Sequence, residues 1–401
     1  MMQSGAEPIN LSIGLMIFPL RNPDEKEQVL LLQFIALLAP LVRELSLITG
    51  NFHTSLLYDN VSVINVRAPI IKVAKESVLS KAWRLFLAQF NLSWGVIRQS
   101  AKIDILMLYF SAGLLFLPVL CARILGKKVV IITTGSGSQS LHSMYPDLLG
   151  RLYSTIVRGI EHIDYSLANK IVVYSNSMIT TLGIERYKHK IMTDISESPY
   201  IACNSYIDTL HFTMKQSLND RGNIVGYVGR LTGEKGVMEF AAAMPLILLK
   251  KPHTRFLVVG DGPLMDKMKT ELTKNGCLEK VEFTGWKPHQ ELTNLLNKMR
   301  FIIVPSYTEV VATVALEAMA CGTICIANPV GATEDVIIDG KTGFLLKDNQ
   351  PSTIADRVIE VWTHPKLSEI QKNARAFVTD NFTYEKVQES WRVILSSLDF
   401  K

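Results

Sequence analysis

Short apolar runs alternate along the chain with longer stretches in which apolar residues recur at helical spacing. Such runs, rich in Val and Ile, are typical of strands that are buried on both faces of a parallel sheet. The alternation predicts an α/β fold built from parallel sheets. The predicted strands are residues 11–17, 45–49, 61–66, 103–108, 129–133, 171–175, 200–204, 224–228, 256–259, 281–283, 301–304 and 323–327.

The strand and helix pattern stops and then restarts near the middle of the chain. Residues 211–223 are polar and irregular, which is typical of a linker. Two similar α/β units in tandem predict two Rossmann-like domains facing across a cleft, over residues 1–212 and 222–378. Ligands bind at the carboxyl ends of the strands in such sheets.

Two apolar runs invite the question of a membrane span. Residues 29–42 are too few to cross a bilayer. Residues 105–122 are barely enough, but Ser111-Ala112-Gly113 and Pro118 divide them into a strand, a turn and a helix. The first residues, MMQSGAEPIN, lack the basic start and apolar core of a signal peptide. We therefore expect a cytoplasmic protein.

Composition changes this picture little. The 401 residues are 48% hydrophobic, which favours a folded chain of two or three domains. The net charge of +5 arises mostly in residues 1–212 and indicates an anionic partner or membrane surface more than nucleic acid. The 5 cysteines form no C-x-x-C motif, so a reduced interior is the simplest expectation.

Two glutamates flank the start of a predicted helix in PSYTEVVATVALEAMACG, residues 305–322. Glu309 lies in the turn after a buried strand, and Glu317 lies two helical turns further on. The backbone N–H groups of Thr313 and Val314 face out of the helix N-terminus, where an anion is favoured. Two interpretations are open: a ligand site, or a Glu309 that only complements the helix dipole beside a solvated Glu317.

Two cations follow the first strand of the second domain. GYVGRLTGEKG places Arg230 and Lys235 at the carboxyl edge of the sheet. An arginine can clamp phosphate oxygens, and a lysine adds a point charge. Because the dipole disfavours cations at a helix start, a bound anion is the better explanation than two solvated side chains. Gly260, in VVGDGP, is weaker evidence because no complete G-x-G-x-x-G follows a strand.

The second half of the chain resembles the donor-binding domain of the retaining glycosyltransferases of family 4, which have the GT-B fold. The resemblance rests on five motifs in the family's order: YVGRLTGEKG, VVGDGP, VEFTGW, PSYTEVVATVALEAMACG and GATEDVIIDGKTGFL. It implies that residues 222–378 bind a nucleotide sugar and that residues 1–212 serve the acceptor. It also implies a C-terminal helix, residues 379–401, that packs back on the first domain.

The resemblance assigns a role to each candidate residue. Glu317 would hold the ribose hydroxyls, and Glu309 would lie near the transferred sugar. Arg230 and Lys235 would neutralise the diphosphate, with Gly260, Thr313 and Val314 also contacting the donor. The acceptor hydroxyl would attack from the side of the leaving group, so that the configuration is retained. No D-x-D occurs in the sequence, and neither a metal nor another cofactor is expected.

Three departures from the family pattern concern the site. Val310-Val311-Ala312 follows Glu309, where the family commonly has Gly-Phe-Gly. Thr134 or Gly135 stands where a histidine is frequent, although Ser136 could hydrogen-bond a sugar. FPLRNPDEKE replaces the usual glycine pair after the first strand, where Arg21 is either an acceptor contact or a surface residue.

These motifs favour a glycosyltransferase that moves a sugar from a nucleoside-diphosphate sugar to a glycan or lipid-linked hydroxyl acceptor, for example in cell-envelope glycan synthesis. Glu309, Arg230 and Lys235 are its catalytic candidates. The alternative is a nucleotide-sugar-binding or scaffold relative without catalysis, which the missing histidine and glycines favour. A nucleotide-sugar epimerase fits less well, because those enzymes carry other histidine and carboxylate patterns.

A basic, aromatic helix is predicted within residues 67–102. Seven apolar residues form one helical stripe: Leu79, Trp83, Phe86, Leu87, Phe90, Trp94 and Ile97. Lys81 and Arg84 lie beside it. One interpretation is a crossover helix whose stripe packs on the sheet. The other is an interfacial helix that rests on an anionic bilayer, so that the protein contacts the inner face of a membrane peripherally.

Overall fold

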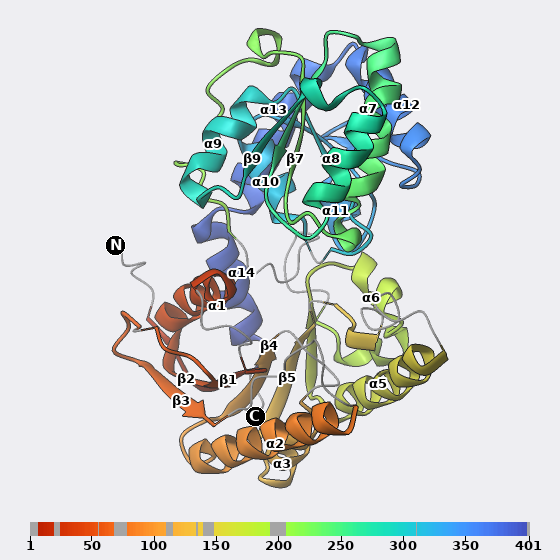
Figure 1. The fold of residues 1–401 in the computed structure, drawn as a ribbon. Coiled ribbons are helices and arrows are strands. Elements are labelled where there is room, and N and C mark those ends of the chain that lie inside the picture. The colour runs from red at the N-terminus through yellow and green to blue at the C-terminus, as the bar shows by residue number, and fades with distance from the viewer. Residues whose placement is uncertain are drawn as a thin grey trace. The chain divides into compact units, whose positions relative to one another are not determined.

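The structure, a computed structural model, describes residues 7–19, 25–54, 56–67, 78–109, 115–133, 135–138, 148–192, 206–309 and 311–398. The chain folds into two compact units. Unit 1 comprises residues 1–205 and 387–401, and unit 2 comprises residues 206–386. Figure 1 shows helices layered against a parallel sheet in each unit.

Unit 1 contains a six-stranded parallel sheet in the order β3-β2-β1-β4-β5-β6. Its elements are β1 (Ile9–Ile17), α1 (Glu25–Leu38), β2 (Val42–Gly50), β3 (Val61–Val66), α2 (Val78–Gln99), β4 (Ile105–Tyr109), α3 (Phe116–Ile124), β5 (Lys128–Thr133), α5 (Leu148–Leu167), β6 (Lys170–Val173) and α6 (Ser177–Leu182).

Unit 2 contains a second six-stranded parallel sheet, in the order β12-β11-β10-β7-β8-β9. Its elements are β7 (Ile224–Val228), α7 (Val237–Lys250), β8 (Arg255–Val259), α8 (Met265–Lys274), β9 (Val281–Gly285), α9 (His289–Lys298), β10 (Phe301–Val304), α10 (Thr313–Ala320), β11 (Ile324–Ala327), α11 (Thr333–Val336), β12 (Phe344–Leu345), α12 (Pro351–Trp362) and α13 (Leu367–Asn381). α14 (Tyr384–Ser396) follows and carries the chain back into unit 1.

Both sheets have the strand order of the Rossmann fold, and the predicted α/β architecture is confirmed. In each unit the direction of strand succession reverses between two central strands, β1 and β4 in unit 1 and β7 and β10 in unit 2. Helices on either side of such a reversal leave to opposite faces of the sheet, which opens a crevice at the strands' carboxyl ends. The topology therefore defines one expected ligand position in each unit.

Aromatic packing joins α1 and α14 to the sheet of unit 1. Phe34 stacks on Tyr109 of β4 at 4.5 Å between ring centroids, and Trp391 meets Phe34 edge-on at 4.9 Å. Gln388 of α14 donates a hydrogen bond to the carbonyl of Leu37. The C-terminal segment thus contributes core residues to unit 1 from Val387 onward.

The segment from residue 206 to residue 223 belongs to unit 2, although we predicted that the first domain extends to residue 212. Its backbone is tied to unit 2 by side chains of α9 and by its own Arg221. Lys215 N–H donates to Asn297 Oδ1 at 2.7 Å, and Arg221 donates to the carbonyl of Met299 at 2.9 Å. Such hydrogen bonds join polar residues that are far apart in the sequence, so the pattern of apolar residues does not predict them.

Helix α2 is the predicted crossover helix between β3 and β4, but the prediction that its aromatic stripe packs on the sheet is wrong. Trp83 is 61% exposed, Phe90 58% and Trp94 51%, and Phe86 and Ile97 are also exposed. Smaller residues are buried on the opposite face, Ala88, Leu92 and Val96 among them, and Gly95 lies against Ile48, Ile64 and Val66 of the sheet. A Cβ at Gly95 would lie 2.9 Å from Ile48 of β2, so a bulky stripe could not approach the sheet as closely.

The two apolar runs that raised the question of a membrane span fold as parts of the sheet and helix layers. Residues 29–42 form the second part of α1, a short 3₁₀ turn and the start of β2. The described residues of 105–122 form β4 and most of α3. Among the described helices, none combines the length and apolar character needed to cross a membrane. The predicted strand at residues 200–204 lies outside the described residues.

Candidate functional site in the second unit and a cavity in the first

Three loops meet at the carboxyl edge of the unit 2 sheet, where β7 and β10 lie side by side. We call them the β7 loop (residues 229–236), the β8 loop (residues 260–264) and the β10 loop (residues 305–312). Backbone hydrogen bonds join them: Tyr307 N–H donates to the carbonyl of Glu234 at 2.9 Å, and Leu231 N–H donates to that of Asp261 at 2.9 Å. The loops therefore form one connected rim over the strand reversal.

Glycines allow this close approach. Gly236 has a φ of +65°, and a Cβ there would lie 1.9 Å from the carbonyl oxygen of Pro305. Gly260 has a φ of +136°, and a Cβ there would lie 1.9 Å from the carbonyl oxygen of Gly229. Both positions combine a left-handed backbone with direct backbone contact, so only glycine fits. The N–H of Gly260, a predicted donor contact, donates to Gly285 O at 2.9 Å.

Lys235 and Glu309 form the centre of the rim. Lys235 Nζ lies 2.7 Å from Glu309 Oε1, and Ser306 Oγ donates to the same oxygen at 2.7 Å. Both charged side chains are largely buried, at 22% and 13% exposure. The structure thus brings together two of the three catalytic candidates, 74 residues apart in the sequence. A fixed cation and a fixed carboxylate, held with little freedom, can orient a polar ligand.

Arg230 lies at the outer side of the same rim. Its guanidinium is 3.4 Å from the carboxylate of Glu234, four residues further along the chain, and is 71% exposed, so it can reorient toward an anion. Tyr227 fixes the backbone below it, because its buried hydroxyl donates to the Arg230 carbonyl at 2.7 Å. Burial raises the pKa of Tyr227, and the Glu309 charge adds to this effect, so the hydroxyl remains a donor.

Glu317 is not the solvated residue of the simpler interpretation. It is buried in α10, with 7% of its side chain exposed, and His289 Nε2 lies 2.7 Å from its Oε1. The hydrogen bond between the His289 ring and the Glu317 carboxylate raises the pKa of His289, which favours an imidazolium–carboxylate pair in which the ring donates. His289 begins α9 and was not among the predicted site residues. The sequence offered only a weak signal for it, a histidine directly after Lys287-Pro288 at a helix start.

The N-terminus of α10 is oriented by the β10 loop. Thr313 and Val314 are its first two residues, and no side chain caps this helix end in the part of the chain that the structure describes. Two asparagines hold the loop backbone: Asn349 Nδ2 donates to Pro305 O at 2.8 Å and Asn328 Nδ2 to Ser306 O at 3.1 Å. The first N–H groups of α10 are therefore presented from an anchored turn, as an anion site requires. Val310 lies outside the described residues.

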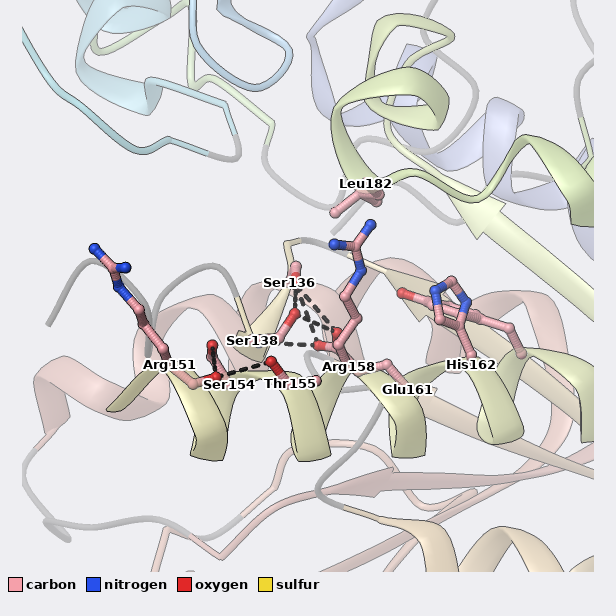
Figure 2. Close-up of a pocket in the computed structure, with 10 residues that line it drawn as sticks. Ser136, Ser138, Arg151, Ser154, Thr155, Arg158, Glu161, His162 and Leu182 are labelled. Atoms are coloured by element: carbon pink, nitrogen blue, oxygen red, sulfur yellow. Dashed lines mark hydrogen bonds between the residues drawn. The ribbon is translucent and has the colours of Figure 1, made fainter. Parts of the chain in front are cut away.

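The acceptor-side candidates of unit 1 are only partly described. Arg21 and Thr134 lie outside the described residues. Ser136 lines a cavity of about 550 Å³ between α5 and residues 136–138 (Figure 2). Its hydroxyl contacts Ser138 Oγ at 2.8 Å and the buried carboxylate of Glu161 at 3.2 Å. Glu161 was not among the predicted site residues.

No group of three or more His, Cys, Asp or Glu side chains that could hold a metal ion occurs among the described residues. The candidate site in unit 2 is instead built from cations, a helix N-terminus and two carboxylates. That set suits a ligand which carries both negatively charged oxygens and hydroxyl groups. The expectation of a metal-free diphosphate site stays a prediction.

Comparisons with known proteins find similarity mainly in the second unit. Residues 211–377 match the family described as glycosyl transferases group 1. An uncharacterized glycosyltransferase of Methanocaldococcus jannaschii is 30% identical over 173 residues, which cover 43% of this chain and 47% of that protein. A glycogen synthase of Mycobacterium tuberculosis is 32% identical over 162 residues, which cover 40% of this chain and 39% of that protein.

Solved structures extend the similarity to the fold of both units. HepE of Anabaena, solved in complex with UDP, has a TM-score of 0.71 at 16% identity, and the match covers 97% of this chain and 100% of that one. Residues 211–377 of the second unit are thus similar to the glycosyl transferases group 1 family, and the chain as a whole has a two-domain α/β fold of the GT-B type. The sequence matches span less than half the length of the two curated relatives.

Proposed function

We propose that the protein is a glycosyltransferase that moves a sugar from a nucleoside-diphosphate sugar to a hydroxyl acceptor with retention of configuration. The observation that carries this proposal is the pairing of Lys235 with Glu309 at the strand reversal of a group 1 domain, beside the N-terminus of α10. HepE, which has a similar fold, was solved in complex with UDP, and this supports a nucleotide sugar as the donor.

The proposed mechanism is electrostatic. Breaking the glycosidic bond of the donor leaves a nucleoside diphosphate, so negative charge grows on the phosphate oxygens in the transition state. Lys235, Arg230 and the N–H groups of Thr313 and Val314 would stabilise that charge without reorganising. Glu317 would bind the ribose hydroxyls, and Glu309 would orient the transferred sugar. A phosphate oxygen would take the proton of the attacking hydroxyl.

The alternative proposal is a relative that binds nucleotide sugars without catalysing transfer. It is favoured by the missing glycine pair after the first strand and by the missing first-domain histidine, since Thr134 or Gly135 stands where a histidine is frequent in the family. Neither residue can accept a proton as an imidazole does. The two proposals share the donor site and differ only in turnover.

A ligand screen followed by a turnover assay tests both proposals. The purified chain is melted with UDP, GDP, ADP and their sugar conjugates, because a ligand that binds only the native state raises the melting temperature. We expect one nucleotide to stabilise the protein and its sugar conjugate to be hydrolysed or transferred, with the anomeric configuration of the product read by NMR. Binding without turnover would favour the non-catalytic relative.

Matched variants connect the screen to the site. Arg230→Ala and Lys235→Ala are expected to weaken binding of that nucleotide by about 1.5–3 kcal/mol each, the contribution of a hydrogen bond to a charged group. Lys250→Ala, which removes an exposed cation of α7 in the same unit, is the control. Unchanged affinity in both site variants would reject the assignment.

We further propose that unit 1 contacts an anionic membrane surface through α2, so that the acceptor is lipid-linked. Five exposed apolar side chains form one face of this helix: Trp83, Phe86, Phe90, Trp94 and Ile97. Arg98 lies 5.4 Å from the centroid of the Trp94 ring. Tryptophan and phenylalanine beside arginine match the interface between lipid tails and anionic headgroups.

A further inference from the structure

The cavity in unit 1 is not part of the proposed donor site, which lies in unit 2. It lies in a single unit, between one face of α5 and the Ser136–Ser138 turn that follows β5. Its volume of about 550 Å³ is that of a small-molecule site. The side chains around it are mainly polar, so its expected ligand is polar as well.

The charged side of the cavity is a stripe along α5. Arg151, Thr155, Arg158 and His162 recur at intervals of four, three and four residues, which places them on one face of the helix. Figure 2 shows both guanidinium groups on the side of α5 where Ser136 and Leu182 lie. Within the described part of the chain, no carboxylate forms an ion pair with either arginine.

The carboxylate of Glu161, the acidic residue of the cavity, accepts hydrogen bonds from the Ser136–Ser138 turn. Its Oε1 accepts the N–H of Gly137 at 2.7 Å, and its Oε2 accepts the hydroxyl of Ser138 at 2.8 Å. Glu161 is only 4% exposed and these hydrogen bonds go to the Ser136–Ser138 turn, so this carboxylate fixes the wall of the cavity. Burial, Arg186 and Arg158 lower the pKa of His162, in agreement with a positive potential along the stripe.

We propose that this cavity binds a phosphoryl group of the acceptor, with Arg151 and Arg158 as its main contacts. A phosphoryl group has three acceptor oxygens and up to two negative charges, one oxygen and one charge more than a carboxylate, so it can pair with both guanidinium groups. The inference rests on the proposed function and deepens it, because it gives the acceptor a phosphate. That phosphate can belong to a lipid or to a soluble sugar.

Binding of inorganic pyrophosphate tests the cavity independently of turnover. The probe is titrated calorimetrically at constant ionic strength, with the nucleoside diphosphate from the screen at saturation so that the donor site is occupied. Arg151→Gln/Arg158→Gln is compared with Arg84→Gln/Arg98→Gln, which removes the same two charges from α2 in the same unit. Both arginines of the cavity are exposed, so the variant is expected to fold.

We expect the cavity variant to bind pyrophosphate at least about tenfold more weakly than the wild type and the α2 variant to retain its affinity. Equal affinity of the cavity variant and the wild type would overturn the proposal. The nucleotide titration separates the two proposals, because a cavity variant that still binds nucleotide leaves the donor site intact. Failure of every nucleotide to bind would reject the proposed function, whatever pyrophosphate does.

The source of the phosphate is distinguished by two further ligands. Glucose 1-phosphate represents a soluble acceptor, and vesicles with phosphatidic acid represent a lipid phosphate, with phosphatidylglycerol vesicles as the control for charge. If Arg151→Gln/Arg158→Gln weakens binding of glucose 1-phosphate or of phosphatidic acid vesicles, the proposal is supported and the affected ligand shows which kind of phosphate is bound. Unchanged binding of both ligands by this variant overturns the proposal.

Discussion

At the scale of single residues, the two glutamates of the candidate site have different surroundings, and this difference predicts different roles. Glu309 shares one oxygen between Lys235 and Ser306 at the rim, whereas Glu317 lies buried in α10 against His289. A group at the rim can respond to charge that develops during the reaction. A buried group on a rigid helix holds a part of the ligand that does not change.

We therefore expect Glu309→Gln to lower kcat more than it weakens nucleotide binding, and Glu317→Gln to weaken nucleotide binding by about 1.5–3 kcal/mol. Glu317 would grip the ribose equally in the ground state and the transition state, so its loss appears in affinity. Steady-state kinetics and nucleotide titration of both variants provide the measurement. Full turnover by Glu309→Gln would exclude a catalytic role for that residue.

His289 predicts a pH dependence of stability. The Glu317 hydrogen bond raises the folded-state pKa of His289 above its ordinary value of 6.5, so the pair stabilises the folded protein fully below pH 6.5. The stabilisation is lost as the pH rises through the folded-state pKa. Because the imidazole is 60% exposed, solvent screening limits the effect to about 1 kcal/mol or less.

Urea unfolding of the wild type and His289→Gln at pH 5.5 and pH 8.5 measures this effect. We expect the wild type to be the more stable protein at the lower pH and the difference to shrink at the higher pH. His253→Gln, at an exposed histidine of the same unit, serves as the control. A difference that stays constant between the two pH values would contradict a charged His289–Glu317 pair.

At the scale of elements, the buried strands could be predicted because short runs of Val and Ile between polar turns are typical of strands in a parallel sheet. The predicted strands at residues 61–66, 224–228 and 301–304 coincide with β3, β7 and β10. β12 was missed because its two residues are too few to form a pattern. Helix α2 was predicted as an element, but the pattern alone left open which of its faces packs on the sheet. The large apolar residues are exposed, and the face with small residues is buried.

The same limit applies to the site. The placement of Arg230, Lys235 and Glu309 at one edge of the sheet could be predicted because they follow strands, and parallel strands bring their carboxyl ends to one edge. The roles of His289 and Glu161 could not be predicted, because each lies on a helix and its hydrogen-bond partner depends on how that helix packs. Contacts between residues far apart in the sequence produce no periodic pattern.

The exposed face of α2 predicts membrane binding that depends on both its aromatic and its basic residues. We expect co-sedimentation with anionic vesicles that weakens in high salt and in the variants Trp83→Ser/Trp94→Ser and Arg84→Glu/Arg98→Glu. Nucleotide affinity should not change, because these positions lie in unit 1 and the donor site lies in unit 2. Leu249→Ser, at an exposed apolar residue of unit 2, is the control.

Two results would remove the membrane proposal and point to an acceptor free in solution. One is equal binding to neutral and anionic vesicles by the wild type, and the other is binding to neither. A third result, equal binding by the wild type and both α2 variants, would place the membrane contact elsewhere in the chain.

At the scale of the whole molecule, the chain repeats one topology twice and gives each copy a different set of side chains. Unit 2 places cations and a helix N-terminus at its strand reversal, whereas the described cavity of unit 1 lies beyond β5, against α5. Separate cores support the two units, since Phe240, Phe256 and Phe301 belong to a cluster formed within unit 2 alone. A ligand held by one unit should therefore stabilise that unit first.

This division predicts where a nucleotide changes hydrogen exchange. We expect the nucleoside diphosphate to slow exchange at the β7 loop, the β10 loop and the first turn of α10, because binding suppresses local opening around the site. Amides of α5 should keep their exchange rates under the same conditions and respond to pyrophosphate instead. Mass spectrometry of peptides from the two regions, with and without each ligand, provides the measurement. Nucleotide protection centred on α5 and absent from the β7 and β10 loops would move the donor site to the first unit and contradict the proposed roles of Lys235 and Glu309.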